Sequence, residues 1–215
     1  MPHFVCAVFR ECSNPACAFR FPDLENHAPQ SVCPLCGAAA IATHDIDLQC
    51  DERPPSVTMC SVEIFCVLDN IRSVHNVGSI FRTMSGFGVK HAYLCGITPN
   101  PTHQQFIKTS MGAETEIGWQ AVNNAVNICQ DLKSKGCFIV ALESCASSTP
   151  IQDFRIPHNH KRIALIVGNE ISGIDPALLR LSDEILSIPI KGKNKSYNVA
   201  VAFGIGLYAC LTAAK

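Results

Sequence analysis

Apolar residues follow two different spacings along most of this chain. Residues 61–69 form a nearly continuous run of β-branched and apolar side chains, which is typical of a buried strand. In residues 76–87 the apolar side chains recur at i, i+3, i+4 and i+7, as on one face of an amphipathic helix: Val77, Ile80, Phe81 and Met84. This spacing predicts a helix that has Asn76 as its N-cap and stops at Gly86 or Gly88.

The same alternation continues towards the C-terminus. Further strands are predicted at residues 91–95, 137–142, 163–167 and 185–190, and further helices at residues 104–110, 121–134, 176–181 and 198–214. Strands that alternate with helices form a mostly parallel sheet that is covered on both faces. The predicted fold class is therefore α/β.

The first fifty residues have a different composition. They hold six of the thirteen cysteines and several prolines, and they show no long helical or strand period. Asp45, Asp47, Asp51 and Glu52, followed by Pro54 and Pro55, are interpreted as a polar linker, because paired prolines favour extended chain. We predict a small module in residues 1–50, a linker in 51–60 and a catalytic domain in 61–215, which a chain of 215 residues can hold.

Composition and charge narrow the function classes. The chain is 47% hydrophobic and 16% charged, so it has enough apolar residues for a buried core. The net charge of −1 gives no support to a nucleic-acid partner, so any basic surface must be local. Many cysteines stand singly inside apolar runs, as buried thiols do in a reducing compartment, and the N-terminus lacks the pattern of a secretion signal. We expect a cytoplasmic protein.

The longest nearly uncharged run, residues 198–214, is the one candidate for a membrane span. It has seventeen residues and includes Asn198, Thr212 and two glycines, so it makes a poor span. We expect a buried helix and no membrane partner.

Four cysteines have the spacing of a zinc ribbon. Cys12 and Cys17 form one pair, and Cys33 and Cys36 form a second pair after a gap of fifteen residues. About fifty residues cannot build much core, so a metal is the expected source of stability. Four thiolates leave no open position, which predicts a structural zinc ion. The alternative is four ordinary buried thiols.

The surface of the ribbon leaves two roles open. Arg10, Arg20, Phe19 and Phe21 offer charge and aromatic faces to RNA. The carboxylates of Glu11, Asp23 and Glu25 are close to them in the sequence, so a structural or protein-contact role is equally compatible.

Three segments that carry polar residues follow predicted strands, where ligands bind in open α/β sheets. The first contains Asn76, Gly78 and Arg82, and the second reads Gly168-Asn169-Glu170 with a further glycine at Gly173. The third alternates three lysines with small residues and then starts an apolar helix: Lys191, Lys193, Lys195, Ser196 and Asn198. Taken singly, each segment is also compatible with a solvated helix cation, an ordinary turn or an N-cap.

Taken in order, these segments resemble the three motifs of the SpoU (TrmH) branch of the SPOUT RNA methyltransferases. That pattern is Asn-x-Gly-x-x-x-Arg, then Gly-Asn-Glu-x-x-Gly, then Pro-Met-x-Gly-x-x-x-Ser-Leu-Asn-Val. The resemblance covers residues 61–215 and implies a parallel α/β sheet with a C-terminal trefoil knot, preceded here by the zinc ribbon. It also implies a homodimer. The chain departs from the pattern at Ile190, where methionine is usual, and at Tyr197, where leucine is usual.

The resemblance further implies S-adenosylmethionine as cofactor, bound by residues of the knot loops: Leu142, Glu143, Gly168, Asn169, Glu170, Ile188, Ile190, Ser196, Tyr197, Asn198 and Val199. The implied reaction is methylation of a ribose 2′-hydroxyl in structured RNA, either tRNA or rRNA. The implied catalytic residues are Arg82, Asn76, Ser196 and Asn198, and the RNA-binding cations are Lys191, Lys193, Lys195 and Arg72.

Arg82 has two possible roles in the reaction. Arg82 is the family's base by analogy, but a guanidinium with a pKa above about 12 rarely loses its proton, so stabilisation of the developing alkoxide is an equal interpretation. Two other functions compete with this one: a SPOUT enzyme that methylates a base nitrogen, and a non-catalytic zinc-ribbon adaptor that binds RNA. A dinucleotide dehydrogenase lacks support because no G-x-G-x-x-G turn follows the first strand of the domain.

Overall fold

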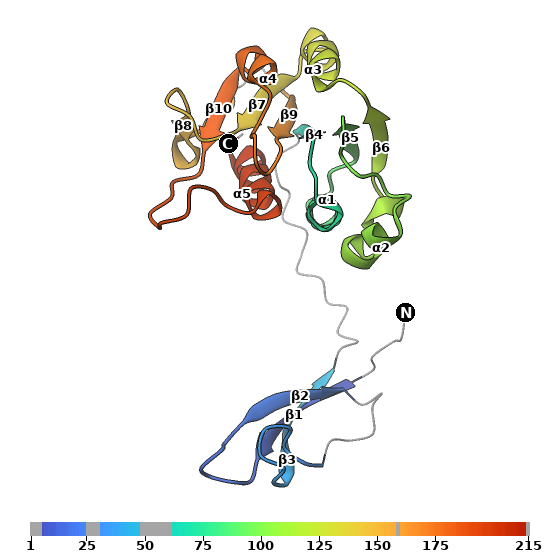
Figure 1. The fold of residues 1–215 in the computed structure, drawn as a ribbon, viewed down its shortest axis with the longest axis vertical. Coiled ribbons are helices and arrows are strands. Elements are labelled where there is room, and N and C mark those ends of the chain that lie inside the picture. The colour runs from blue at the N-terminus through green and yellow to red at the C-terminus, as the bar shows by residue number, and fades with distance from the viewer. Residues whose placement is uncertain (1–5, 25–30, 48–61, 158–159, 214–215) are drawn as a thin grey trace. The chain divides into compact units, whose positions relative to one another are not determined.

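The computed structural model describes residues 6–24, 31–47, 62–157 and 160–213 of the chain (Figure 1). The chain divides into two compact units, Met1–Val57 and Thr58–Lys215, and each is described by itself. The predicted linker at residues 51–60 and Glu25 lie outside the described residues. The domain limits at residues 50 and 61 stay a prediction.

The first unit is a small antiparallel sheet with the strand order β2-β1-β3. The strands are β1 (Cys6–Cys12), β2 (Arg20–Leu24) and β3 (Ala40–Asp47). The assignment of Asp45 and Asp47 to a polar linker was wrong, because both lie in β3, where they pair with β1. This sheet is held by cross-strand hydrogen bonds and shows no apolar alternation, so no period in the sequence revealed it.

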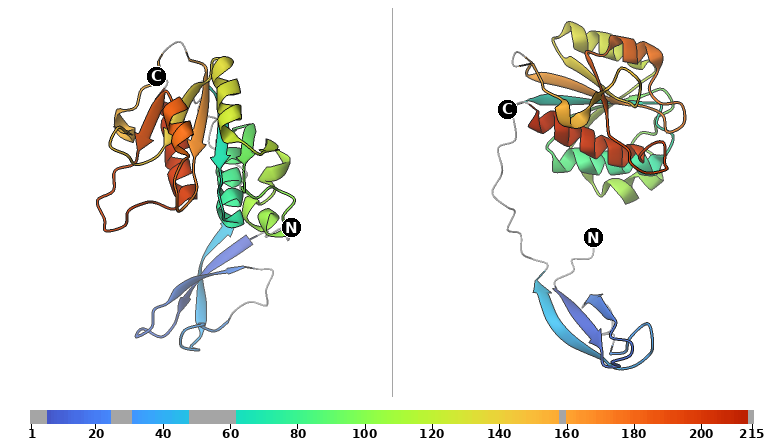
Figure 2. Two further views of the ribbon diagram at one scale, coloured as in Figure 1. Left: turned by 45° about the horizontal axis from the view of Figure 1, so that its top comes forward. Right: turned by 90° about the vertical axis from the view of Figure 1, so that its left-hand side faces the viewer.

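The second unit contains a seven-stranded sheet with the order β6-β5-β4-β9-β7-β10-β8 (Figures 1 and 2). All of its strand pairs are parallel. The strands are β4 (Glu63–Asp69), β5 (His91–Cys95), β6 (Gly118–Val122), β7 (Phe138–Leu142), β8 (Thr149–Pro150), β9 (Arg162–Val167) and β10 (Glu184–Ser187). The predicted α/β class with a parallel sheet is confirmed, and the trefoil knot stays a prediction.

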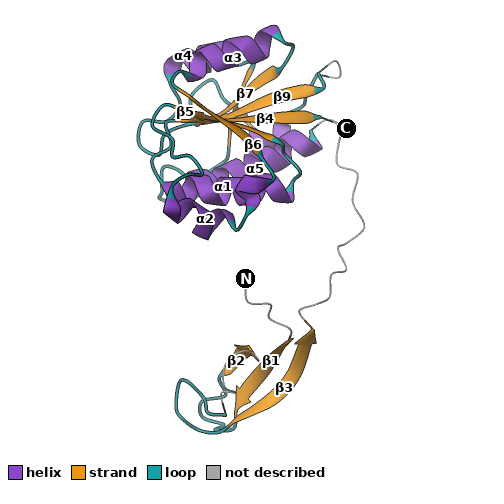
Figure 3. Cartoon of the chain, turned by 90° about the vertical axis from the view of Figure 1, so that its right-hand side faces the viewer, coloured by secondary structure: helices purple, strands orange, loops and turns teal. Residues whose placement is uncertain are grey.

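Helices cover both faces of this sheet (Figure 3). One face carries α1 (Val74–Gly86), α2 (Gln104–Ser110) and α5 (Val199–Thr212), and the other carries α3 (Ala125–Ser134) and α4 (Pro176–Leu181). Two single 3₁₀ turns, Ala113–Thr115 and Ile151–Asp153, complete the described elements. Helix α5 lies beside α1 on the shared face (Figure 2).

The central strands are buried on both sides, and each contributes to two cores. On β4 the side chains of Cys66 and Leu68 pack towards α1 and α5, whereas Val67 packs into the core under α3 and α4. On β9 Leu165 and Ile166 divide in the same way. This arrangement follows from the alternation of side chains along a strand, and it explains why these strands read as continuous apolar runs.

Several predicted elements match the structure. The strand at residues 91–95 and the helices at 104–110 and 176–181 have the predicted limits. Helix α1 ends at Gly86, as predicted, and Asn198 is the N-cap of α5, the local role that was given as the alternative for the third segment. No helix among the described residues combines the length and the apolar character that a membrane span requires.

Three predicted limits were wrong by three residues or more. Helix α1 begins at Val74 with Ser73 as its N-cap, because the Ser73 hydroxyl accepts a hydrogen bond from the Asn76 amide and starts the helix one turn earlier.

The helix predicted at residues 121–134 begins only at Ala125, after the edge strand β6. Strand β6 is mostly exposed, so it lacks an apolar period and depends on backbone pairing with β5. The strand predicted at residues 185–190 ends at Ser187, shortly before Pro189, which has no amide hydrogen to donate.

Candidate functional site

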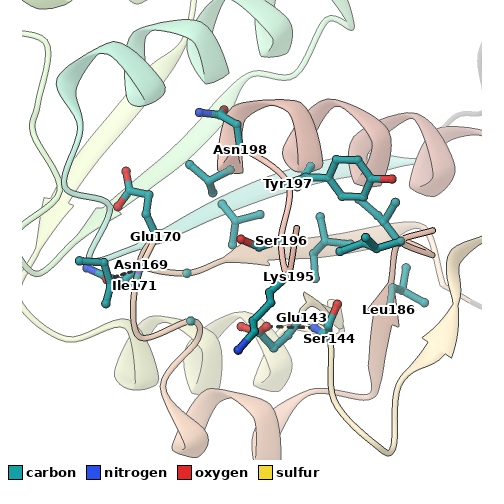
Figure 4. A pocket seen from close by; sticks show the side chains of 18 residues that line it. Glu143, Ser144, Asn169, Glu170, Ile171, Leu186, Lys195, Ser196, Tyr197 and Asn198 are labelled. Carbon is teal, nitrogen blue, oxygen red and sulfur yellow. Dashed lines mark hydrogen bonds between the residues drawn. The ribbon is translucent and has the colours of Figure 1, made fainter. Parts of the chain in front are cut away.

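A cavity of about 530 Å³ lies at the carboxyl ends of β7, β9 and β10 (Figure 4). Three loops form its walls, one after each of these strands. Parallel strands bring their carboxyl ends to the same edge of a sheet, which is where open α/β sheets bind ligands. The volume falls within the range of about 300–1,000 Å³ that is usual for small-molecule sites.

All eleven residues that the family resemblance assigns to the cofactor line this one cavity: Leu142, Glu143, Gly168, Asn169, Glu170, Ile188, Ile190, Ser196, Tyr197, Asn198 and Val199. Their role as ligands of a cofactor stays a prediction. Seven further residues line the cavity: Ser144, Val167, Ile171, Gly173, Leu186, Lys195 and Ala202. Of these, Gly173 belongs to the second motif and Lys195 was predicted to contact RNA. The sequence held one signal for this set: Ile171 is an isoleucine inside an otherwise polar turn. In the structure its side chain is 77% exposed.

The turn after β9 has a tight backbone that requires glycine. Asn169 and Gly173 exchange two backbone hydrogen bonds of 3.1 and 2.9 Å, and Gly173 has a positive φ of 72°. A Cβ atom on Gly168 would collide with the backbone of Gly173. The Asn169 side-chain oxygen accepts hydrogen bonds from the amides of Ile171 and Ser172, so the turn is held from inside.

Glu143 connects two of the three loops. One of its carboxylate oxygens accepts a hydrogen bond of 3.0 Å from the amide of Ile174, in the loop after β9. The other accepts one of 2.9 Å from the amide of Ser144, in the loop after β7. Glu143 therefore joins the cavity walls to each other.

A chain of polar contacts connects the starts of α1 and α5. The Glu170 carboxylate accepts hydrogen bonds from the Arg72 amide at 2.9 Å, the Ser73 amide at 3.2 Å and the Asn76 side-chain amide at 2.8 Å. The Asn76 side-chain oxygen in turn accepts a hydrogen bond of 3.1 Å from the Asn198 side chain. The oxygen of Asn198 caps α5 by accepting from Ala200 and Val201. Three segments that are far apart in the sequence are therefore joined by one network.

The pKa of Glu170 lies below its ordinary value. Partial burial raises the pKa of this carboxyl, but the hydrogen bonds from the Arg72 amide, the Asn76 side chain and the Ser73 amide lower it more. A carboxylate that accepts several hydrogen bonds acts as an anchor for the start of α1. We therefore assign Glu170 a structural role in holding the site together.

Glu170→Gln is expected to lower the free energy of unfolding by about 1 kcal/mol at pH 7, because the neutral amide makes weaker hydrogen bonds. The folded pKa is lower than the unfolded pKa, so the contribution of Glu170 is complete above the ordinary value of 4.5 and is lost as the pH falls below it. Urea unfolding at pH 7 and near pH 3.5 checks this, with Asp153→Asn as the matched control. A difference between wild type and Glu170→Gln that stays constant over this pH range would contradict the assignment.

The structure brings only some of the predicted catalytic residues together. Asn76 and Asn198 are in direct contact, and Ser196 lines the cavity next to Asn198. Arg82 is exposed and does not line the cavity, and its side chain makes no hydrogen bond or ion pair within the described residues. It stands six residues after Asn76 on α1. The catalytic role of Arg82 therefore rests on the family resemblance.

Gly78 of the first motif allows two helices to approach closely. A Cβ atom at this position would overlap the side chain of Thr109 on α2. Phe81 and Phe106 continue the contact between α1 and α2 with an edge-to-face ring pair at 5.0 Å. The glycine is thus explained by helix packing.

The predicted RNA-binding cations are available to solvent. Arg72, Lys191, Lys193 and Lys195 are all exposed, and within the described residues none of them forms an ion pair with a carboxylate. Lys195 also lines the cavity. The charge required for binding an anionic polymer is therefore local, as the small net charge demands.

The four cysteines of the first unit form a cluster that fits a tetrahedral metal. Their sulfur atoms all lie within 4.8 Å of one another, with 3.4 Å between Cys12 and Cys36 and 3.9 Å between Cys17 and Cys33. A zinc ion with Zn–S bonds of about 2.3 Å places its sulfur ligands about 3.8 Å apart. None of the four is in a disulfide. Hydrogen bonds from the Ala38 amide and from the Cys12 and Cys17 thiols lower the pKa of Cys36 to about 7, whereas burial raises the pKa of Cys12 to about 12.

Most of the ribbon side chains that were candidates for RNA contact are used within the ribbon. Arg10 forms an ion pair of 2.7 Å with the buried Asp23, and Arg20 lies 3.6 Å from Glu11. The Phe19 and Phe21 rings stack at 5.7 Å, and Phe21 is buried. These contacts favour a structural use of Arg10 and Phe21.

A parallel sheet covered on both faces, with a cavity formed by the loops at its carboxyl ends, defines the second unit as an α/β ligand-binding domain. The chain belongs to the SpoU rRNA Methylase family, which it matches over residues 63–208.

Similar proteins include RNA methyltransferases. The chain is 30% identical over 152 residues to the tRNA (guanosine(18)-2′-O)-methyltransferase of Aquifex aeolicus, covering 68% of this chain and 67% of that protein. It is 28% identical over 154 residues to the 23S rRNA (guanosine(2553)-2′-O)-methyltransferase of Bacillus subtilis, covering 72% and 60%. The chain spans little more than half the length of several other curated relatives.

A solved relative has the same fold. The crystal structure of an AdoMet-bound rRNA methyltransferase from Sinorhizobium meliloti matches with a TM-score of 0.63 at 28% identity, covering 68% of this chain and 55% of that one. The TrmH/SpoU tRNA modifying enzyme of A. aeolicus matches with a TM-score of 0.62 at 27% identity, covering 69% and 74%.

Proposed function

We propose that this protein transfers a methyl group from S-adenosylmethionine to a ribose 2′-hydroxyl of structured RNA, either tRNA or rRNA. The observation that carries this proposal is the single cavity lined by all eleven residues that the family motifs assign to the cofactor. Two relatives are named as guanosine 2′-O-methyltransferases, and a solved relative is named as AdoMet-bound, which supports the same reaction and cofactor.

The cavity suits a cofactor that has both polar and apolar parts. Leu142, Ile188, Ile190 and Val199 offer apolar walls, while Glu143, Ser196 and the backbone of residues 168–170 offer hydrogen-bonding groups. When bound, S-adenosylmethionine supplies a methyl group on a positively charged sulfur, which is open to attack by an oxygen nucleophile. The closed turn after β9 holds the backbone in place before binding, so less ordering is required when the cofactor enters.

The catalytic residues must place the target hydroxyl and relieve its proton. The side chains of Asn76 and Asn198 are hydrogen-bonded to each other. Asn76 is also held by Glu170, and Asn198 by its cap of α5, so both side chains have a defined orientation. The Ser196 hydroxyl makes no hydrogen bond within the described residues and is available to a ligand. We assign Arg82 to the stabilisation of the developing alkoxide and the adjacent phosphate; its use as the base is the alternative.

RNA is held by Arg72, Lys191, Lys193 and Lys195 in this proposal. Contacts between these cations and phosphates release counterions, so affinity for RNA decreases as the salt concentration rises.

We further propose that the protein is a homodimer that uses α5. This helix is apolar around its circumference, and Val201, Ile205 and Tyr208 are 53%, 37% and 55% exposed. A second copy that covers these side chains would remove them from water. Sedimentation velocity of the purified chain measures the oligomeric state directly.

We also propose that the Cys12, Cys17, Cys33 and Cys36 cluster holds a structural zinc ion and that the protein works in the cytoplasm. The geometry of the four sulfurs supports the metal. Ten cysteines of the described residues are free of disulfides, which is typical of a reducing compartment.

The test of the reaction is to incubate the purified protein with labelled S-adenosylmethionine and total RNA and to identify the methylated nucleoside after digestion. A 2′-O-methyl nucleoside is the expected product, and it also names the base. A base-methylated nucleoside would move the protein to the other SPOUT branch. Absence of both methyl transfer and cofactor binding would leave the RNA-binding adaptor as the function.

A further inference from the structure

The loop between β10 and α5 forms one wall of the cavity and has few internal contacts. Ile188, Ile190, Lys195, Ser196 and Tyr197 all line the cavity. Figure 4 labels the last three of them. Every residue from Lys191 to Asn198 is exposed. Such a segment has little to hold it in one conformation.

A single side chain closes this loop. The Tyr197 hydroxyl donates a hydrogen bond of 3.1 Å to the backbone carbonyl of Pro189, eight residues earlier. Within the described residues, no other hydrogen bond or ion pair involves any residue of 188–197. All three lysines of the loop lie between the two ends of this contact.

The hydroxyl is a feature of this chain. The family pattern has leucine at the position of Tyr197, and leucine has no group that can donate to a carbonyl. The ring of Tyr197 keeps an apolar surface against the cavity, while its hydroxyl reaches across to Pro189. The substitution therefore adds a contact while it retains an apolar wall.

We propose that Tyr197 is a positioning residue whose hydroxyl joins the two ends of the lysine-rich loop 189–197, which lies along the cavity. The tether holds the loop in the conformation that forms the cavity wall before a ligand arrives. The effect on cofactor affinity rests on the proposed function, whereas the effect on the loop does not. Without the tether, the ligand must order the loop itself, and its affinity decreases by the entropy of that step.

Tyr197→Phe removes only the hydroxyl and is the principal test. In the ligand-free protein we expect trypsin to cleave after Lys191, Lys193 and Lys195 about five- to tenfold faster, the factor that corresponds to one lost hydrogen bond. The dissociation constant for S-adenosylmethionine, measured by calorimetry, is expected to rise by a similar factor. Tyr93→Phe on β5 is the matched control, because it removes a tyrosine hydroxyl from a strand outside the cavity.

Tyr197→Leu separates the hydroxyl from the ring. If the hydroxyl is the tether, the leucine variant is cleaved as fast as the phenylalanine variant. Equal cleavage rates for wild type and Tyr197→Phe would overturn the proposal, and so would a leucine variant that is cleaved at the wild-type rate. The two proposals can fail separately. If Tyr197→Phe is cleaved faster but the wild type does not bind S-adenosylmethionine, the tether is supported and the proposed function is refuted. Circular dichroism shows whether each variant is folded.

Discussion

Arg82→Ala is expected to lower kcat for methyl transfer by a factor of about 10²–10³ and to leave the affinity for S-adenosylmethionine unchanged. This range is typical when one group that stabilises a developing negative charge is removed. Arg82 does not line the cavity, so its loss removes no contact to the cofactor. It is exposed on α1, so its loss also removes no buried packing.

The measurement is steady-state methyl transfer with saturating RNA and saturating cofactor, together with calorimetric binding of the cofactor. Arg180→Ala is the matched control, because Arg180 is an exposed arginine of α4, which covers the other face of the sheet. A decrease in kcat of less than threefold for Arg82→Ala would refute the role.

Arg82→Lys distinguishes the two roles that remain open for Arg82. If positive charge stabilises the alkoxide, the lysine variant retains part of the activity with the pH dependence of the wild type. If this residue removes the proton, the rate of the lysine variant depends on an ionisation near about 10.4, the ordinary pKa of lysine. The pH–rate profiles of the two proteins decide between these outcomes.

Removal of zinc is expected to unfold the ribbon and to leave the second unit folded. Structural zinc contributes about 10–16 kcal/mol in small zinc modules. In the small sheet of β1, β2 and β3, by contrast, the buried apolar residues within the described part are few. The double variant Cys17→Ser, Cys36→Ser is expected to behave as the chelated protein does, because it leaves only two thiolates.

Two signals follow the two units separately. The chain has one tryptophan, Trp119, and it lies in β6 of the second unit, so its fluorescence reports on that unit. Amide resonances of residues 6–47 report on the ribbon. We expect chelation to collapse the ribbon resonances while the midpoint of urea unfolding by Trp119 fluorescence stays unchanged. Cys145→Ser, outside the cluster, is the control. Dispersed ribbon resonances in metal-free protein would contradict a structural zinc.

The local patterns of the sequence were sufficient for the class of fold and for the location of the site. Continuous apolar runs predicted β4 and β9, because strands buried on both faces have no polar positions. The spacing of Cys12, Cys17, Cys33 and Cys36 predicted the cluster, because two short pairs can curl around one ion. The second and third motifs follow β9 and β10, so they indicated the edge of the sheet where the cavity lies, because parallel strands end at one edge.

Local patterns failed where the stabilising partner is distant in the sequence. Strand β6 is exposed and depends on its pairing with β5, so no period marked it. Ser73 and Asn76 are both suitable N-caps for α1, and the helix begins at Val74 with Ser73 as its cap. Glu170, 97 residues after Ser73, supports this earlier start by accepting a hydrogen bond from the Ser73 amide. Propensity alone does not distinguish between two adequate caps.

The sequence by itself determined which residues have the chemistry for this site, since a side chain's charge and hydrogen-bonding capacity belong to the residue type. Only the tertiary structure decided which of them meet. Asn76 and Asn198 are 122 residues apart and come into contact because α1 and α5 pack on the same face of the sheet. The Tyr197 hydroxyl finds Pro189 only through the path of the loop between them. Contacts of this kind depend on strand order and loop closure, which have no local signature in the chain.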